Sequence, residues 1–383
     1  MLTFKQKLNI DPALFEIYGA PPQKTVFFDI ETTGFSRSGC FIYLICAGFL
    51  EDGVPTLFQW FCEAPDDEPK VITSFLEFIK GAKLLIHFNG SSFDVPFVEA
   101  RAAQFGITTD FNSFKQVDLQ HCIVPVKSAL GLGHCRQKDV EVFLSINRED
   151  IYNGGELIEV YKQYLGRSRY DKLTHGTPLA TPDGSGLPTL PRTPSEALLS
   201  LLLLHNAEDV EGMIKISPLY PITMLMQGKE APCKPELELS EESFILRYHF
   251  NTGISRKFTV SFYKKWPIYL SVSDNGIEVA IDIFTGTLKH FFSDYRNYFY
   301  LPNEDMAVHK SVGSGVDKTR RKNAKPETCY VKKAGVFVPL AQRGLSYFAV
   351  HSKKSMIFTE ADKLATFPPE EVSKTLLAFL STK

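Results

Sequence analysis

Two acidic side chains lie close together in an apolar stretch near the start of the chain. Asp29 and Glu31 belong to residues 26–35, which read VFFDIETTGF. The pattern predicts a buried strand, on which side chains two residues apart share a face. Two such carboxylates repel each other, and a divalent cation between them relieves the repulsion. The stretch therefore predicts a metal site, although an edge strand with two solvated acids is an alternative.

Two later segments offer acids of the same kind. Asp94 ends the sequence NGSSFD, which follows the apolar residues 83–88, and Asp209 ends the sequence HNAED, which begins at His205. On a helix, His205 and Asp209 would lie one turn apart on one face. The chain thus offers four carboxylates in three segments and an imidazole that can exchange a proton near neutral pH. Solvated or helix-capping acids and a hydrogen-bonded histidine are the alternative interpretation.

The order of these motifs resembles that of the DEDD 3′–5′ exonucleases, the DnaQ-like superfamily, which have the ribonuclease-H-like fold. It is most similar to the YprB-type bacterial ribonuclease-H-like domains. The likeness covers residues 21–225 and rests on DIETTG, on NxxxFD and on the final acid, with further likeness in residues 117–119, 135–141 and 146–156. One departure is His205, which stands four residues before Asp209, the spacing at which the family has Tyr. Family members with His have it five residues before the acid.

The resemblance implies hydrolysis of phosphodiester bonds in DNA or RNA with two divalent cations, Mg²⁺ or Mn²⁺, about 4 Å apart. Asp29 would bridge both ions. Glu31 and Asp209 would hold the ion that carries the attacking water, and Asp94 would hold or orient the second ion. His205 would position or deprotonate the water.

The resemblance also implies contacts with the 3′ end of a single strand. The candidate substrate-binding residues lie close to the acids in sequence: Thr32, Thr33, Gly34, Phe35, Asn89 and Phe93. The first three would bring backbone N–H groups to the terminal nucleotide, with Gly34 allowing a close approach or a positive φ. Phe35 would stack on the last base. Packing at the edge of the core is the alternative for Phe35 and the preferred one for Phe93, and we interpret Asp118 as a helix cap.

Apolar periodicity and turn signals predict the elements that position these residues. The expected strands are residues 25–31, 41–50, 55–62 and 83–88, and the expected helices are 71–81, 95–105, further helices through 113–165, and 197–216. Residues 1–20 are expected to form an arm with a helical turn at 12–18, and residues 166–195 a long loop. The alternation predicts an α/β domain at 21–228, a ribonuclease-H-like mixed sheet flanked by helices.

Beyond about residue 230 the pattern changes to short alternating strands, expected at 243–250, 257–263, 268–273, 277–284 and 287–292. Hairpin turns are expected at 274–276 and 285–286. We place the domain boundary within residues 227–235. The pattern predicts a smaller, β-rich (α+β) C-terminal domain at 229–383, to which no function is assigned.

The composition fits a two-domain globular protein: the chain has 383 residues, of which 44% are hydrophobic and 22% charged. Its longest uncharged aliphatic run, residues 197–204, is too short to span a bilayer, so we expect no membrane partner. No secretory signal is expected from the N-terminal residues. Seven scattered cysteines without CxxC indicate a reducing cytoplasm and argue against a disulfide framework.

The charge is divided unevenly along the chain. Residues 1–232 carry 20 Lys and Arg against 28 Asp and Glu, a net −8, whereas residues 233–383 carry 22 against 16, a net +6. Most of the excess lies in residues 309–333, which follow the aromatic residues Tyr295, Tyr298, Phe299 and Tyr300. Cations beside aromatic rings suit single-stranded nucleic acid, although a solvated basic loop is equally compatible. A structure-selective endonuclease and a catalytically silent nucleic-acid-binding module remain alternative functions, and protein partners are unknown.

Overall fold

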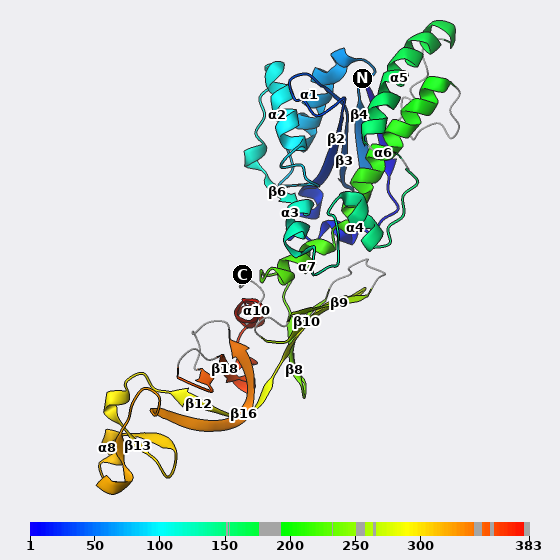
Figure 1. Cartoon of the computed structure of the whole chain (residues 1–383). Coiled ribbons are helices and arrows are strands. Elements are labelled where there is room, and N and C mark those ends of the chain that lie inside the picture. The colour runs from blue at the N-terminus through cyan, green and yellow to red at the C-terminus, as the bar shows by residue number, and fades with distance from the viewer. Residues whose placement is uncertain are drawn as a thin grey trace. The chain divides into compact units, whose positions relative to one another are not determined.

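The computed structural model in Figure 1 describes residues 1–150, 152, 154–175, 193–231, 233–249, 257–262, 266–340, 347–352 and 356–378. The chain divides into two compact units. The first contains Met1–Thr223, and the second contains Met224–Phe250 and Lys257–Lys383. No helix in these described ranges combines the length and the apolar character that crossing a membrane requires.

A six-stranded mixed sheet forms the centre of the first unit. Its strands, in spatial order, are β1 (Leu2–Lys7), β4 (Val54–Phe61), β3 (Ile42–Glu51), β2 (Thr25–Thr32), β5 (Leu84–His87) and β6 (Lys115–Asp118). The pairs β1–β4, β4–β3 and β3–β2 are antiparallel, and the pairs β2–β5 and β5–β6 are parallel. Helices flank the sheet (Figure 1), which confirms the predicted fold class.

Helices cover both faces of this sheet. The chief ones are α1 (Glu68–Ile79) and α2 (Asp94–Gln104) on one face and α5 (Gly154–His175) and α6 (Pro194–Ile216) on the other (Figure 1), and shorter ones are α3 (Leu119–Ile123), α4 (Gln137–Phe143) and α7 (Leu219–Met226). Phe28 of β2 packs on Phe75 of α1, with ring centroids 5.2 Å apart. Because side chains alternate along a strand, Asp29 and Glu31 share the opposite face, on which α6 lies.

Helix α6 approaches strand β3 closely at a glycine. A Cβ atom built on Gly48 would lie 2.8 Å from Val210 Cγ1 and 3.0 Å from Ile214 Cδ1 of the helix. Only a residue without a side chain leaves room for this approach. The N-terminus of α6 is fixed by a capping box, in which Thr193 accepts from the N–H of Glu196 and the Glu196 side chain accepts in return. Helix α6 thus has a fixed start and lies close to β3, the neighbour of β2 in the sheet.

Three expectations about the first unit are wrong. Residues 1–20 are more than an arm, since they supply β1, and the helical turn is a 3₁₀ turn at Pro12–Phe15. Residues 115–118 form the parallel strand β6 where only helices were expected, because β6 is short and mostly polar. The expected loop at 166–195 begins too early, since α5 continues to His175. Residues 176–192 of that loop lie outside the described residues.

The second unit is rich in strands, as predicted. One antiparallel sheet has the order β7 (Glu236–Leu239), β8 (Ser243–His249), β11 (Gly276–Asp282), β10 (Ile268–Ser273) and β9 (Phe258–Phe262). A closed barrel contains β12 (Phe284–Phe291), β16 (Tyr330–Leu340), β18 (Ile357–Glu360) and β17 (Phe348–Ala349). The turn at 274–276 joins β10 to β11 as expected, but residues 285–286 lie inside β12.

Among its described residues, the second unit also has a small sheet and the short α-helices α8, α9 and α10. The sheet has the order β14 (Met306–His309), β13 (Tyr298–Leu301) and β15 (Lys322–Asn323). The helices are α8 (Lys310–Gly313), α9 (Ala361–Leu364) and α10 (Pro369–Leu377). The small sheet therefore brings the aromatic residues of β13 beside part of the basic segment, which is residues 309–333.

Candidate active site

The two acids of β2 are held by donors from neighbouring elements. Asn206 Nδ2 of α6 donates to Asp29 Oδ2 at 2.9 Å, and the hydroxyl of Tyr43 lies 3.5 Å from Glu31 Oε2. Asp29 is half-buried and Glu31 is buried. Burial, and then repulsion by neighbouring carboxylates, hold the pKa values of Asp29 and Glu31 well above their ordinary range. This strand end therefore favours an added positive charge.

Asp94 lies at the first position of α2, next to the same strand. Its Oδ1 accepts a hydrogen bond of 3.1 Å from the backbone N–H of Ile30, the residue between Asp29 and Glu31. Burial raises the pKa of Asp94 to about 6, although the nearby His87 and the hydrogen bond from Ile30 oppose the shift. Repulsion from Asp94 is in turn the largest charge effect on Asp29. The fold therefore brings Asp94 beside Asp29, as the sequence predicted.

The loop before Asp94 is fixed by Asp118, which ends β6. Its carboxylate accepts the backbone N–H groups of Asn89 at 2.9 Å and Ser91 at 3.1 Å, and it caps α3 by accepting from the N–H of Gln120. Burial raises the pKa of Asp118, but hydrogen bonds from His87, Asn89 and Ser91 outweigh it and hold the pKa below the ordinary range. The capping interpretation of Asp118 is confirmed, and Asn89 donates its N–H to this acid.

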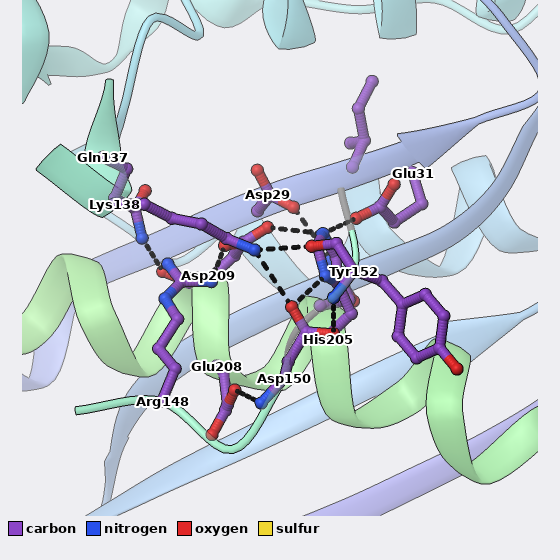
Figure 2. A network of polar contacts seen from close by, with 12 residues as sticks. Asp29, Glu31, Gln137, Lys138, Arg148, Asp150, Tyr152, His205, Glu208 and Asp209 are labelled. Atoms are coloured by element: carbon purple, nitrogen blue, oxygen red, sulfur yellow. Dashed lines mark hydrogen bonds and ion pairs between the residues drawn. The ribbon is translucent and has the colours of Figure 1, made fainter. Parts of the chain in front are cut away.

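Helix α6 brings His205 and Asp209 to the face of β2 that carries the acids. His205 Nε2 lies 3.5 Å from Glu31 Oε1 and 3.3 Å from Asp209 Oδ2. Ligand atoms of these three residues all lie within 4.8 Å of one another, and in the described part of the chain they form a group able to hold a metal ion. Figure 2 shows Asp29 beside this group.

A segment that sequence reasoning left without a role surrounds this group. Asp150 Oδ2 lies 2.6 Å from His205 Nδ1, and Arg148 contacts Asp209 Oδ1 at 2.5 Å (Figure 2). The backbone N–H groups of residues 149 and 150 both donate to the Glu208 side chain at 2.8 Å, which fixes the segment on α6. The available signals were the charged sequence INRED, at residues 146–150, and the family likeness of residues 146–156.

Two further contacts support this segment. Arg148 pairs through two nitrogens with Glu141 of α4, and Lys138 Nζ lies 3.1 Å from Asp150 Oδ2. Burial would raise the pKa of Asp150, but the nearby His205, the backbone N–H of Tyr152 and Lys138 together outweigh it and lower the pKa below its ordinary value. Asp150 is therefore an ionised acceptor for the imidazole.

The other predicted residues form the turn after β2 and its surroundings. The N–H of Thr33 donates to Phe41 O at 3.0 Å, and the Thr32 hydroxyl donates to Gly34 O at 2.9 Å. Gly34 has the expected positive φ, +154°, and a Cβ there would lie 2.8 Å from Cys40 Sγ. Phe35 is 87% exposed, so the core-edge interpretation is wrong for it. Its ring centroid lies 6.1 Å from that of the half-buried Phe93.

Comparison with solved structures gives distant likenesses only. No curated protein matches the chain. Among solved structures, a family B DNA polymerase from the hyperthermophilic archaeon Pyrobaculum calidifontis is 12% identical, with a TM-score of 0.37 over 94% of this chain. This chain spans 46% of the polymerase. The EXO domain of Aedes aegypti Nibbler is 12% identical, with a TM-score of 0.24 over 57% of this chain and 86% of that domain. At these TM-scores neither likeness bears on activity.

The family comparison is more direct. Residues 26–176 match the model of the RNase_H_2 family, which is described as RNase_H superfamily. The matched residues include β2 without its first residue, β3 to β6 and the whole of α5. The helix α6 that follows contacts β2, the strand of the acids. Residues 26–176 are thus similar to the RNase_H superfamily, and the first unit has the ribonuclease-H-like fold, a mixed sheet flanked by helices.

Proposed function

We propose that this chain is a metal-dependent 3′–5′ exonuclease that hydrolyses phosphodiester bonds of DNA or RNA. The observation that carries the proposal is the convergence of acids from three distant segments on one end of β2. Asp29 and Glu31 come from that strand, Asp94 from α2 and Asp209 from α6. Buried carboxylates that raise one another's pKa values are costly without a cation, and functional sites contain such groups.

The donors fit divalent cations that prefer oxygen ligands, such as Mg²⁺ and Mn²⁺. Asp29, Glu31 and Asp209 would hold one ion, and Asp29 with Asp94 would hold a second, as in a two-metal mechanism. Bound ions would stabilise the charge on the attacking and leaving oxygens at phosphorus. Asn206 orients Asp29 through its hydrogen bond, and Arg148 orients Asp209 through its ion pair. Both acids are thus preorganised by this chain's own residues.

Substrate binding is proposed for the turn after β2. The exposed ring of Phe35, next to Phe93, offers a surface on which a terminal base could stack. Thr32, Thr33, Gly34 and Asn89 would line the path of the strand there. In the second unit, basic side chains near β13 and β15 would bind the phosphates of single-stranded nucleic acid. We also propose a cytoplasmic location, because all seven cysteines are free thiols.

Direction and mode of cleavage are tested with matched DNA and RNA single strands in Mn²⁺. A 5′-labelled strand should give a ladder that shortens with time, and a blocked 3′ end should stop it. Products of defined internal length that persist with the blocked end would indicate an endonuclease instead. Binding of the strand without any turnover would indicate a silent binding module.

A further inference from the structure

We infer that His205 is itself a ligand of the bound cation through Nε2, and that Asp150 positions it for this purpose. The ion proposed above between Asp29, Glu31 and Asp209 would then have a nitrogen ligand as well as oxygen ligands, and the site would prefer Mn²⁺ to Mg²⁺. This inference deepens the proposed function and rests on its metal site. It replaces the role that the family resemblance implies for His205, which is to position or deprotonate the attacking water.

Asp150 orients the imidazole ring of His205. Nδ1 lies 2.6 Å from Asp150 Oδ2, and the same carboxylate receives Lys138 Nζ at 3.1 Å. An ionised carboxylate accepts hydrogen bonds only, so the Nδ1 atom of His205 carries the proton and donates it. A neutral imidazole with a proton on Nδ1 has its lone pair on Nε2. A histidine that binds a metal commonly donates its other N–H to a carboxylate in this way.

The Nε2 atom of His205 faces two carboxylates. His205 is 4% exposed, and its Nε2 lies 3.5 Å from Glu31 Oε1 and 3.3 Å from Asp209 Oδ2. A lone pair directed at two carboxylate oxygens is repelled unless a positive charge lies between them. Donor atoms bound to one ion at about 2.0–2.3 Å are roughly 3 to 3.5 Å apart, which agrees with both distances.

Glu31 and Asp209 each use one carboxylate oxygen for a protein donor. Tyr43 contacts Glu31 Oε2, and Arg148 contacts Asp209 Oδ1. The second oxygen of each acid, Glu31 Oε1 and Asp209 Oδ2, faces His205. Each acid therefore has one oxygen engaged with a protein donor and presents the second to the imidazole. This arrangement suits an ion bound by Glu31 Oε1, His205 Nε2 and Asp209 Oδ2.

The donor set indicates the class of metal. Imidazole nitrogen suits first-row transition metals, whereas Mg²⁺ prefers oxygen ligands and water. The competing arrangement is a doubly protonated His205 that pairs with the carboxylates and leaves no nitrogen for a metal. The two arrangements differ in whether a nitrogen atom bonds to the ion, which can be measured directly.

Pulsed electron paramagnetic resonance of Mn²⁺ bound to the full chain provides that measurement. We expect coupling between the ion and a directly bound nitrogen in the wild type. The coupling should vanish in His205→Asn, whose amide can still donate to Asp150 but cannot reach the place of Nε2. Calorimetry should show Mn²⁺ affinity reduced at least 10-fold in His205→Asn, with a smaller change for Mg²⁺.

Asp150→Asn tests the positioning role. We expect a 10- to 100-fold loss of Mn²⁺ affinity with the nitrogen coupling weakened or shifted, while circular dichroism remains that of the wild type. His121→Asn, at an exposed histidine of α3, is the control and should change neither readout. Mn²⁺ bound without nitrogen coupling, or no Mn²⁺ binding, would overturn the inference. Nitrogen coupling without nuclease activity would instead contradict the proposed function alone.

Discussion

At the scale of single residues, the acids are held in place by hydrogen bonds and ion pairs from their neighbours. Asp29, Asp94 and Asp209 each have one oxygen on a protein donor: Asn206, the N–H of Ile30 and Arg148, respectively. Their geometry is therefore set before any ion binds, which lowers the cost of assembling the site. The remaining cost is electrostatic, because burial disfavours the ionised form of these groups.

That cost predicts how the stability of the metal-free protein depends on pH. The pKa of Asp94 is about 6 in the folded chain against an ordinary 3.8. As the pH rises from about 4 to above 6, the unfolded chain loses the Asp94 proton first, so the free energy of unfolding falls. Relative to Asp94→Asn, the wild type should lose on the order of 2 to 3 kcal/mol across this window.

Urea unfolding of both proteins at pH 4, 5, 6 and 7 in the presence of a chelator measures this difference. A divalent cation added at pH 7 should restore stability to the wild type more than to Asp94→Asn. The free energy of unfolding of the wild type, relative to that of Asp94→Asn, should fall between pH 4 and pH 7. If this difference stays constant or rises, the pKa of Asp94 is not raised.

At the scale of elements, the position of α6 against β3 decides where His205 and Asp209 lie. Gly48→Ala would place a Cβ atom 2.8 Å from Val210 and 3.0 Å from Ile214, so that α6 must shift or the side chains repack. We expect a loss of about 1–3 kcal/mol in the free energy of unfolding and a several-fold lower cleavage rate. Urea unfolding and initial-rate assays measure both effects.

Gly81→Ala is the matched control, because a Cβ at Gly81 meets no atom within 4 Å. It should leave both measurements near those of the wild type. Equal effects of the two substitutions would show that the helix-to-sheet approach at Gly48 does not set the geometry of the site.

The elements also show how far the sequence could predict the structure. Continuous apolar runs predicted β2, β3 and β5 closely, because strands buried on both faces leave a clear pattern. Strand β6 was missed because its sequence KQVD has one apolar residue. The pairing of Asp94 with β2 followed from motif order. The contact of Asp150 with His205 could not be predicted, because it depends on how residues 146–150 fold over α6.

At the scale of the whole molecule, the charge is divided between the two units. Residues around β15 carry cations that face solvent, such as Lys318, Lys322 and Lys325, while Arg321 lies 4.4 Å from the ring centre of Phe299 in β13. This combination suits the phosphates and bases of a single strand. The acidic first unit alone would repel that strand, so the second unit would supply much of its affinity.

Replacing Lys318, Lys322 and Lys325 together by Ala tests this division. We expect weaker binding of a single-stranded oligonucleotide and a smaller dependence on salt, by about 2 in the slope of log K against log salt. Fluorescence anisotropy at several salt concentrations gives both values. The same change at Lys7, Lys24 and Lys83, which are exposed in the first unit, is the control. Equal losses from both triple variants would contradict a specific role for the basic segment.

Cleavage of a 5′-labelled single strand by the wild type and by Asp29→Asn, side by side in Mn²⁺, tests the central claim most directly. Asp29 is the acid whose pKa responds to Asp94, Asp209 and Glu31 together. We predict a metal-dependent ladder from the wild type and a rate at least 100-fold lower from Asp29→Asn, with circular dichroism showing that both proteins are folded. Undiminished cleavage by Asp29→Asn, or no cleavage by the wild type on DNA or RNA, would contradict the account.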